Sequence, residues 1–377
     1  MGKQLADIAL DLKNSDKNVL LIYAFNGVGK TRLSGEFKSL FRQGTSSIEK
    51  EIEHKEFLYF NAFTEDLFYW DNDLENDLEM NMKIQSNAFT DWIYREEGKE
   101  KEIQDFFTHY TNSKAEANYD PDFTEVSFLI PGTEEKIKIS KSEESCFIWS
   151  VFFSFLTAIV NDINEAKKEK TESKFKNLKY VFIDDPVTSL DENHLIEQAV
   201  DLSNLIKEGH TSLKFIITTH NPLFFNVLSN ELDIKVVDMD YRPKKTKRYL
   251  LGKTDDGLYQ LVIIDDNVPF SYHIYMLKEL DNAIKSNAVK KYHFNLLRNI
   301  LEKTASFLGY SQWGDLLPPD SSYQARLINA SSHSRISTTE VPMITSEDIT
   351  MMKTIVDYIT QRYHFRVSRS SETTRSI

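Results

Sequence analysis

Residues 24–31, AFNGVGKT, place two glycines, a lysine and a threonine at the spacing of a phosphate-binding loop. Gly27 and Gly29 can adopt the backbone angles that let N–H groups close around phosphate oxygens. Lys30 is placed to reach the β- and γ-phosphates of a nucleotide, and Thr31 to bind Mg²⁺. The stretch therefore predicts nucleotide binding by the following residues: Asn26, Gly27, Val28, Gly29, Lys30, Thr31 and Arg32.

Two aspartates follow the apolar run YVFI, residues 180–183, and a histidine follows the apolar run FIITT, residues 215–219. Asp184 is expected to bind Mg²⁺ through water, and Asp185 to orient the water that attacks the γ-phosphate. His220 is a further candidate for nucleotide hydrolysis, although a single histidine at a strand end is more often structural. These residue types in this order favour an NTPase over a chance match.

A third group lies in the helical pattern KYHFNLLRNILEKTASFLGY, residues 291–310. Arg298 and Glu302 are four residues apart, so their side chains meet on one helix face. On spacing alone they form an exposed ion pair worth about 0.5 kcal/mol or less. The same pair with a histidine suits metal-free RNA cleavage by the substrate's 2′-OH, which needs a base, an acid and a cation beside the phosphorane. His333 is the candidate histidine, and His293 is a rival that is more often structural.

These side chains need a scaffold, which the pattern of apolar residues outlines. Short apolar runs alternate with helical patterns from residue 18 to residue 239, which predicts a mainly parallel sheet flanked by helices. Residues 71–120 are polar and acidic, and we expect helix or loop there. Beyond about residue 268 the pattern is helical. The fold class is therefore α/β, with a P-loop ATPase domain over residues 1–265, a mainly α-helical domain over 266–365 and a frayed tail over 366–377.

Composition limits the classes of partner and the location. The net charge of −13 argues against broad, unspecific binding of nucleic acid, although the last quarter carries slightly more Lys and Arg than Asp and Glu. Cys146 is the only cysteine, which excludes an internal disulfide framework and a cysteine-cluster zinc site. The polar N-terminus is unlike a signal peptide, and the longest apolar run, residues 146–160, favours a buried helix over a membrane span. We expect a cytoplasmic protein without a membrane partner.

The motifs in this order resemble those of the ABC-type ATPases. The resemblance implies that Asp191, in SLD, and Ser140, in the signature-like stretch ISKSEES, also contact nucleotide. It implies a head-to-tail pair as well, in which Ser140 of one copy completes the nucleotide site of the other. Ser142 stands where this family has glycine, which affects how closely the backbone approaches a γ-phosphate.

Two further departures concern catalysis. Asp185 stands where glutamate is more usual, about one methylene short, so we expect slow turnover that suits a switch. No clear glutamine of the Q-loop is present, and Asn61 is a weak substitute.

Stretches outside the ATPase motifs resemble the PrrC family of bacterial anticodon nucleases. They include FNAFTEDLFYWDND at residues 60–73, FIWSVFF, YHFNLLRNILEKTASFLGY and SSHS, and the similarity runs to about residue 335. The resemblance implies an ABC-type N-terminal domain that controls a HEPN-like helical ribonuclease. The nuclease motif of that family, Arg-x-x-x-Glu with a downstream histidine, falls on Arg298, Glu302 and His333.

The same resemblance implies a substrate, cofactors and partners. The substrate is tRNA, typically tRNA-Lys, cut in the anticodon loop to leave a 2′,3′-cyclic phosphate and a 5′-hydroxyl without a metal. The cofactors are ATP or GTP with Mg²⁺, with a second regulatory nucleotide such as dTTP. The partners are further copies of the chain and a type I restriction–modification complex, which holds the nuclease silent until phage infection releases it.

Two other functions remain open at this point. The first is an ABC-type ATPase that senses DNA ends or stress, in which Arg298, Glu302 and His333 are dispensable. The second is a transporter subunit with a separate membrane partner. Tyr272, His273 and Tyr275, in SYHIYMLKEL, are candidate tRNA contacts in the nuclease interpretation, with a core role as the alternative.

Overall fold

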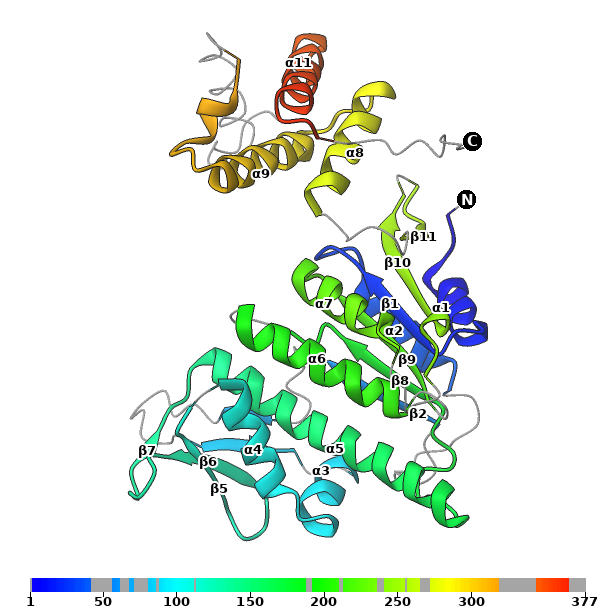
Figure 1. The fold of residues 1–377 in the computed structure, drawn as a ribbon, viewed down its shortest axis with the longest axis vertical. Helices are drawn as coiled ribbons and strands as arrows, with labels where there is room; N and C mark the ends of the chain where they lie inside the picture. Colours follow the sequence, from blue (N-terminus) through cyan, green and yellow to red (C-terminus); the bar gives the residue numbers. More distant parts are fainter. Residues whose placement is uncertain are drawn as a thin grey trace. The chain divides into compact units, whose positions relative to one another are not determined.

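The computed structural model describes residues 2–41, 56–61, 68–70, 81–85, 88–111, 113–187, 192–209, 213–235, 241–254, 256–264, 272–318 and 344–365 (Figure 1). The chain divides into two compact units, Met1–Phe270 and Ser271–Ile377, each with its own hydrophobic core. The predicted domain boundary at residues 265 and 266 and the predicted tail over 366–377 lie outside the described residues.

A six-stranded sheet in the order β11-β10-β1-β9-β8-β2 forms the centre of the first unit. Neighbouring strands from β10 to β2 are parallel, and β11 is antiparallel to β10. The strands are β1 (Val19–Tyr23), β2 (Phe57–Asn61), β8 (Tyr180–Asp184), β9 (Lys214–Thr219), β10 (Thr246–Lys253) and β11 (Tyr259–Ile263). Every residue of β1 is buried, as expected of a strand covered on both faces. The prediction of a mainly parallel sheet is confirmed.

The register of this sheet brings the ends of several strands to one edge. Asp184, the last residue of β8, pairs with Asn61 of β2 on one side and with Thr218 of β9 on the other. Tyr23, the last residue of β1, pairs with Thr219. Polar residues that follow these strands therefore meet at the carboxyl edge, where open α/β sheets bind their ligands.

Helices pack on both faces of the sheet. The helices α1 (Leu5–Asn14) and α2 (Lys30–Ser39) share a core cluster with Leu20 and Ile22 of β1. Successive strand residues point to opposite faces, and Tyr23 contacts Phe225 of α7 (Pro222–Asp233) edge to face. The helix α6 (Glu192–Gly209) packs beside α7.

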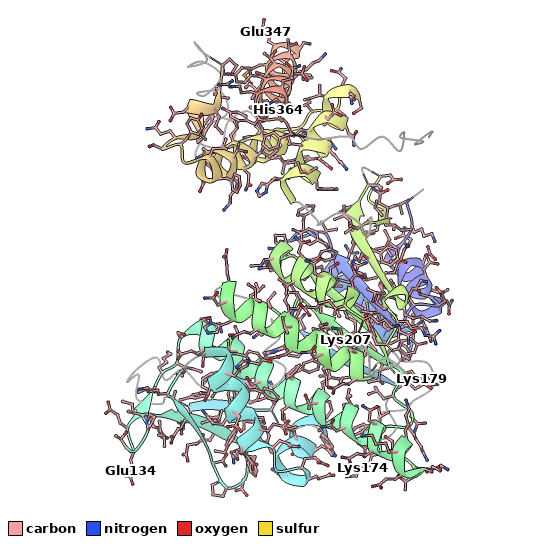
Figure 2. The ribbon with its side chains drawn as sticks, viewed as in Figure 1. Glu134, Lys174, Lys179, Lys207, Glu347 and His364 are labelled. Atoms are coloured by element: carbon pink, nitrogen blue, oxygen red, sulfur yellow. The ribbon has the colours of Figure 1, made fainter. Side chains whose placement is uncertain are left out.

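A second, antiparallel sheet has the order β3-β4-β6-β5, with β7 paired to β6. Its strands are β3 (Phe68–Trp70), β4 (Asn81–Ile84), β5 (Glu116–Tyr119), β6 (Glu125–Leu129) and β7 (Lys136–Ile137). Residues 71–120 were expected to be largely helix or loop, and β4 and β5 are short strands within that stretch. The same region holds α3 (Ala88–Asp91), the π-helix η2 (Trp92–Glu96) and α4 (Glu100–Thr111). In Figure 2, Glu134 lies at the turn between β6 and β7.

The helix α5 (Lys141–Glu169) is the longest of the described residues and packs against α4 and α6. Aromatic residues fill its buried face, among them Phe147, Trp149 and Phe152. By length and composition α5 is apolar enough to cross a membrane, but 78% of its most apolar 18-residue window is buried inside the protein. That burial is typical of a core helix, as the sequence predicted. Lys174 and Lys179 mark the connection from α5 to β8 (Figure 2).

The described part of the second unit is helical. It contains α8 (Tyr272–Lys285), α9 (Lys291–Leu308), the 3₁₀-helix η4 (Trp313–Leu316) and α11 (Ser346–Arg362). Their apolar faces form one core that includes Leu277, Leu297, Leu301 and Ile355. Figure 2 labels Glu347 and His364 near the two ends of α11. The predicted helical character of this region is confirmed for the described residues.

Candidate functional site

The phosphate-binding loop lies between β1 and α2, in the strand–loop–helix context that the motif needs. Gly27 has φ 79° and Gly29 has φ 121°, values that residues with a side chain rarely adopt. Gly29 is the residue before α2, so the free N–H groups of the first helical turn point into the loop. Ala24, where the usual first glycine is missing, keeps a negative φ and donates its N–H to the Thr219 carbonyl at 3.0 Å.

The lysine of the loop is held inside the candidate nucleotide site. The side chain of Lys30 is 8% exposed, and its Nζ donates to Asn26 Oδ1 at 3.1 Å and to the Ala24 carbonyl at 3.3 Å. The same Nζ lies 3.4 Å from Asp185 Oδ2. The cation therefore bridges the loop and the carboxyl edge of the sheet, where a γ-phosphate would also be attracted.

Asp184 lies buried among hydrogen-bond donors from three neighbouring segments. Its Oδ1 accepts from the Thr218 hydroxyl, and its Oδ2 accepts from Asn61 Nδ2 at 3.2 Å and from the Tyr59 hydroxyl at 3.4 Å. Burial raises the pKa of the Asp184 carboxyl, although the hydroxyls of Thr218 and Thr31 oppose that rise. Asn61, the weak Q-loop substitute, thus does lie against Asp184.

Asp185 is held in the left-handed region, with φ 53°. Aspartate tolerates this conformation better than most residues, and here the Asp185 N–H donates to the Thr218 carbonyl at 2.8 Å. The Nδ1–H of His220 donates to the carboxylate, with distances of 2.8 Å to Oδ1 and 2.7 Å to Oδ2. Burial alone would raise the pKa of Asp185, but the hydrogen bonds of His220, together with the charges of His220 and Lys30, lower it below the ordinary value.

The chain turns sharply after His220 for a local reason. Asn221 accepts hydrogen bonds from the N–H groups of Leu223 and Phe224 and so caps α7, and Pro222 occupies the first turn. The cap fixes the direction in which β9 ends, which sets His220 against Asp185. The structure therefore brings Lys30, Asp184, Asp185 and His220 together, as the motifs predicted.

The residues expected to hold Mg²⁺ fit that ion. The Thr31 hydroxyl is close enough to the Asp184 carboxyl to oppose the rise in its pKa that burial causes, so two oxygen ligands lie beside the loop. Mg²⁺ prefers one or two protein oxygens, with phosphates and waters completing its shell.

Two other residues expected to contact nucleotide, Ser140 and Arg32, have different partners. Ser140 is exposed and caps α5 through a capping box with Glu143, and α5 packs on α4 and α6. Ser142 lies in the first turn of α5 with a negative φ, so its backbone does not require glycine. Arg32 points instead to Tyr259, whose hydroxyl accepts from its Nη1 at 3.1 Å. Asp191 lies outside the described residues.

The structure joins the two predicted nuclease residues on α9. Arg298 donates from Nε to Glu302 Oε1 at 2.7 Å, and the two side chains are 21% and 45% exposed. Phe294, Leu297 and Leu301 bury the opposite face of α9 in the core. The pair therefore lies on a packed helix, with Glu302 exposed and Arg298 partly buried. His333 lies outside the described residues.

The rival histidine has a local role. His293 is 2% exposed, and its Nδ1 accepts the Lys290 N–H at 2.7 Å at the start of α9. His273 and Tyr275 on α8 are partly buried, and burial lowers the pKa of His273 and raises that of Tyr275 to about 12. The side chain of Tyr272 lies outside the described part. Contacts of these residues with tRNA stay a prediction.

Sequence reasoning missed several residues at both places. Tyr59 and Thr218 contact Asp184, and their signal was only that each precedes the end of a strand that pairs with β8. Glu302 also lines a pocket of about 570 Å³ with Tyr310 and Trp313. Nothing in the helical pattern alone indicated that pocket.

Fold and site together define a P-loop ATPase joined to a helical unit. A protein-family model described as an AAA domain matches residues 97–357, more than half of the chain. A curated Escherichia coli protein named "Anticodon nuclease" is 44% identical over 393 aligned positions, which cover 95% of this chain and 96% of that protein. The chain belongs to the bacterial anticodon nuclease family and carries its ATPase domain.

Solved structures offer only distant likenesses. The SMC head domain from Thermotoga maritima is 14% identical, with a TM-score of 0.30, over 67% of this chain and 91% of that one. An Smc head domain with an extended coiled coil, bound to the C-terminal domain of ScpA derived from Pyrococcus furiosus, is 15% identical, with a TM-score of 0.28, over 52% and 40%. Neither bears on the function of this protein.

Proposed function

We propose that this protein is a nucleotide-regulated endoribonuclease that cleaves tRNA, with tRNA-Lys as the expected isoacceptor, in the anticodon loop. The observation that carries the proposal is the end-to-end similarity to the Escherichia coli anticodon nuclease, 44% identity over 95% of this chain. The joined pair Arg298–Glu302 supports it, because the motif of the family falls on these two residues. We assign the ATPase to the first unit and the HEPN-like ribonuclease to the second.

The cleavage step uses the substrate's own hydroxyl. The 2′-OH attacks the adjacent phosphorus, the bond to the 5′-oxygen breaks, and the products are a 2′,3′-cyclic phosphate and a 5′-hydroxyl. Glu302 and His333 share the roles of base and acid, so one takes the 2′-OH proton and the other gives a proton to the leaving oxygen. Arg298 stabilises the charge of the phosphorane, which gives the site its cation without a metal. The 2.7 Å contact holds this cation beside the carboxylate.

The first unit supplies control by nucleotide. ATP or GTP would bind with its phosphates on the loop at Gly27–Lys30, and Thr31 and Asp184 would hold Mg²⁺, which neutralises phosphate charge. The engagement of Asp185 by His220, at 2.7 Å, supports slow hydrolysis, because the carboxylate must leave this contact to orient a water. A slow NTPase suits a switch, and a second regulatory nucleotide such as dTTP fits the same scheme.

Self-association and a restriction–modification partner complete the proposal. Ser140 caps α5, whose packing partners are α4 and α6, whereas Lys30 begins α2. This separation supports a head-to-tail pair in which Ser140 and Asp191 of one copy complete the nucleotide site of another. Release from a type I restriction–modification complex during phage infection, in the cytoplasm, rests on the resemblance to the family.

The test is cleavage of total bacterial tRNA by the purified full-length protein, with the 5′-hydroxyl ends mapped. We expect discrete cuts in one anticodon loop, slowed about 100-fold or more in Arg298→Ala, because a cation at a developing charge is worth that much. Lys285→Ala is the matched control, since it removes another exposed i, i+4 ion pair, Asp281–Lys285 at 2.5 Å, from the same unit.

Two results would contradict the proposal. Equal cutting by wild type and Arg298→Ala would make the pair a surface ion pair. Intact tRNA with every nucleotide, together with normal hydrolysis, would favour the ATPase that senses DNA ends or stress.

A further inference from the structure

A pocket of about 570 Å³ opens beside the nuclease pair, within the second unit. One wall is the face of α9 that carries Glu302, Ala305 and Ser306, and the other is the segment from Tyr310 to Gly314. Volumes of this size are typical of sites for small ligands. The pocket belongs to none of the roles assigned so far, although Glu302 forms its edge.

Both walls are fixed by local structure. Gly309, with φ 79°, ends α9 in the left-handed conformation and turns the chain back, and the Tyr310 N–H donates to the Ala305 carbonyl at 2.9 Å. Trp313 begins η4 and packs partly against the core of the unit, beside the fully buried Leu316. The pocket is thus formed before any ligand arrives, which lowers the cost of binding.

The chemistry of the lining favours a flat, neutral ligand. Tyr310 and Trp313 present aromatic rings, while Ser306, Ser311 and Gln312 add hydroxyl and amide groups. Of the residues that the structure describes around the pocket, none is Lys or Arg, and Glu302 would repel an anion. Aromatic rings stack on the face of any nucleobase, and amides and hydroxyls hydrogen-bond its edge.

We propose that this pocket binds the nucleobase of one nucleotide next to the scissile phosphate, stacked on Tyr310. The inference rests on the proposed function and names a subsite of the same reaction. Attack in line with the leaving 5′-oxygen requires the two flanking nucleotides to be splayed apart, so at least one base leaves the stack. Arg298 Nε lies 2.7 Å from Glu302 Oε1. A nucleotide whose base lies beside Glu302 would therefore have its phosphate close to Arg298.

The experiment measures cleavage of anticodon stem-loop RNAs by the full-length protein. The RNAs are intact, abasic on the 5′ side of the cut, or abasic on the 3′ side. Tyr310→Ala is the main variant, because Tyr310 is 43% exposed and its truncation leaves the core intact. Phe307→Ala is the matched control, since Phe307 is an aromatic residue three positions earlier, in the last turn of α9, is 90% exposed and lines a different pocket.

We expect Tyr310→Ala to slow cleavage of the intact RNA about 10-fold, the value of one base stacked on an aromatic ring. Tyr310→Phe should restore the rate, because the ring and not the hydroxyl carries the contact. One of the two abasic RNAs should be cut slowly by wild type and at the same slow rate by Tyr310→Ala, which identifies the base in the pocket. Phe307→Ala should stay within about 2-fold of wild type on every RNA.

Other results overturn the inference and separate it from the proposed function. If wild type cuts and Arg298→Ala does not, but Tyr310→Ala slows intact and abasic RNAs equally, the nuclease stands and the base subsite falls. If wild type cuts nothing, binding of a stem-loop with 2′-deoxyribose at the cut decides. If Tyr310→Ala binds this RNA as tightly as wild type, the base subsite is rejected along with the nuclease. If Tyr310→Ala weakens binding about 10-fold and Phe307→Ala does not, the base subsite is supported although the nuclease is not.

Discussion

The candidate nucleotide site and the proposed nuclease pair, Arg298 and Glu302, differ in how the fold assembles them. Lys30, Asp184 and Asp185 are each less than a tenth exposed, and they come from the start of α2 and the end of β8. Arg298 and Glu302 come from one helix and contact each other, and their side chains are 21% and 45% exposed. The strand order of the sheet assembles the first site from residues that are distant in the sequence. The second pair is already formed by a single helix, and it would need the RNA substrate and a histidine from elsewhere in the chain to act.

The largest effect on activity is expected when the candidate nucleotide site loses the charge of Asp184. Asp184→Asn is expected to reduce Mg²⁺-dependent NTP hydrolysis about 100-fold or more, since it removes a charge that must act in the transition state. It should not lower the thermal midpoint, because burial raises the pKa of Asp184 and so penalises its charged form. Hydrolysis assays and calorimetry of the nucleotide-free protein check both parts. A midpoint several degrees lower would show that the charge stabilises the fold.

Lys30→Ala should weaken nucleotide binding about 10-fold or more, because charge-assisted hydrogen bonds to a phosphate contribute about 1.5–3 kcal/mol. Equilibrium titration with a fluorescent nucleotide measures the loss. Lys38→Ala is the control, because Lys38 is an exposed lysine near the other end of the same helix, α2. Equal nucleotide affinity in wild type and Lys30→Ala would show that the lysine of the loop does not contribute to nucleotide binding.

The acid side of the stability curve tests the buried network. The folded-state pKa of Asp185 lies below its ordinary value of 3.8, so its contribution to stability is present above pH 3.8 and is lost as the pH falls through the folded pKa. Asp185→Asn should therefore be less stable than wild type at pH 7, and the difference should shrink as the pH falls below 3.8. Urea unfolding at several pH values measures it. A difference that does not change with pH would mean that the His220 contact does not stabilise the charge.

A smaller effect is expected at Tyr59. Burial raises the pKa of its hydroxyl to about 12, so the group stays protonated and donates at neutral pH. Tyr59→Phe removes contacts with Ser34, Asn61 and Asp184 and should lower the free energy of unfolding by about 1 kcal/mol. Tyr69→Phe, 43% exposed on the second sheet, should change it by less than about 0.5 kcal/mol. Equal effects would place Tyr59 outside the network.

The sequence predicted much of this arrangement, because two physical regularities apply. Carboxyl ends of parallel strands share one edge, so the order of strands and motifs was enough to place Asp184, Asp185 and His220 near the loop. Residues four apart on a helix meet, which predicted the Arg298–Glu302 contact. Both regularities can be read from short sequence patterns, and the structure agrees with them.

Other features depend on distant pairing that no local pattern encodes. Tyr59 reaches Asp184 because β2 pairs with β8. In this pairing Asn61 lies opposite Asp184, although the two residues are 123 positions apart in the sequence. The short strands β4 and β5 alternate polar and apolar residues over only four positions each. Such short runs do not stand out within a polar, acidic stretch, so helix or loop was expected there. The pocket at Glu302 needs the left-handed turn at Gly309, whose consequence appears only once Trp313 is packed.

The measurement that tests the account most directly is the rate of tRNA cleavage by wild type and Lys30→Ala, each with and without Mg²⁺-ATP or Mg²⁺-GTP. The account predicts that nucleotide changes the cleavage rate of wild type, and that Lys30→Ala cuts at one rate whether or not nucleotide is present. The same response to nucleotide in both proteins would contradict the claim that the buried site controls the exposed pair.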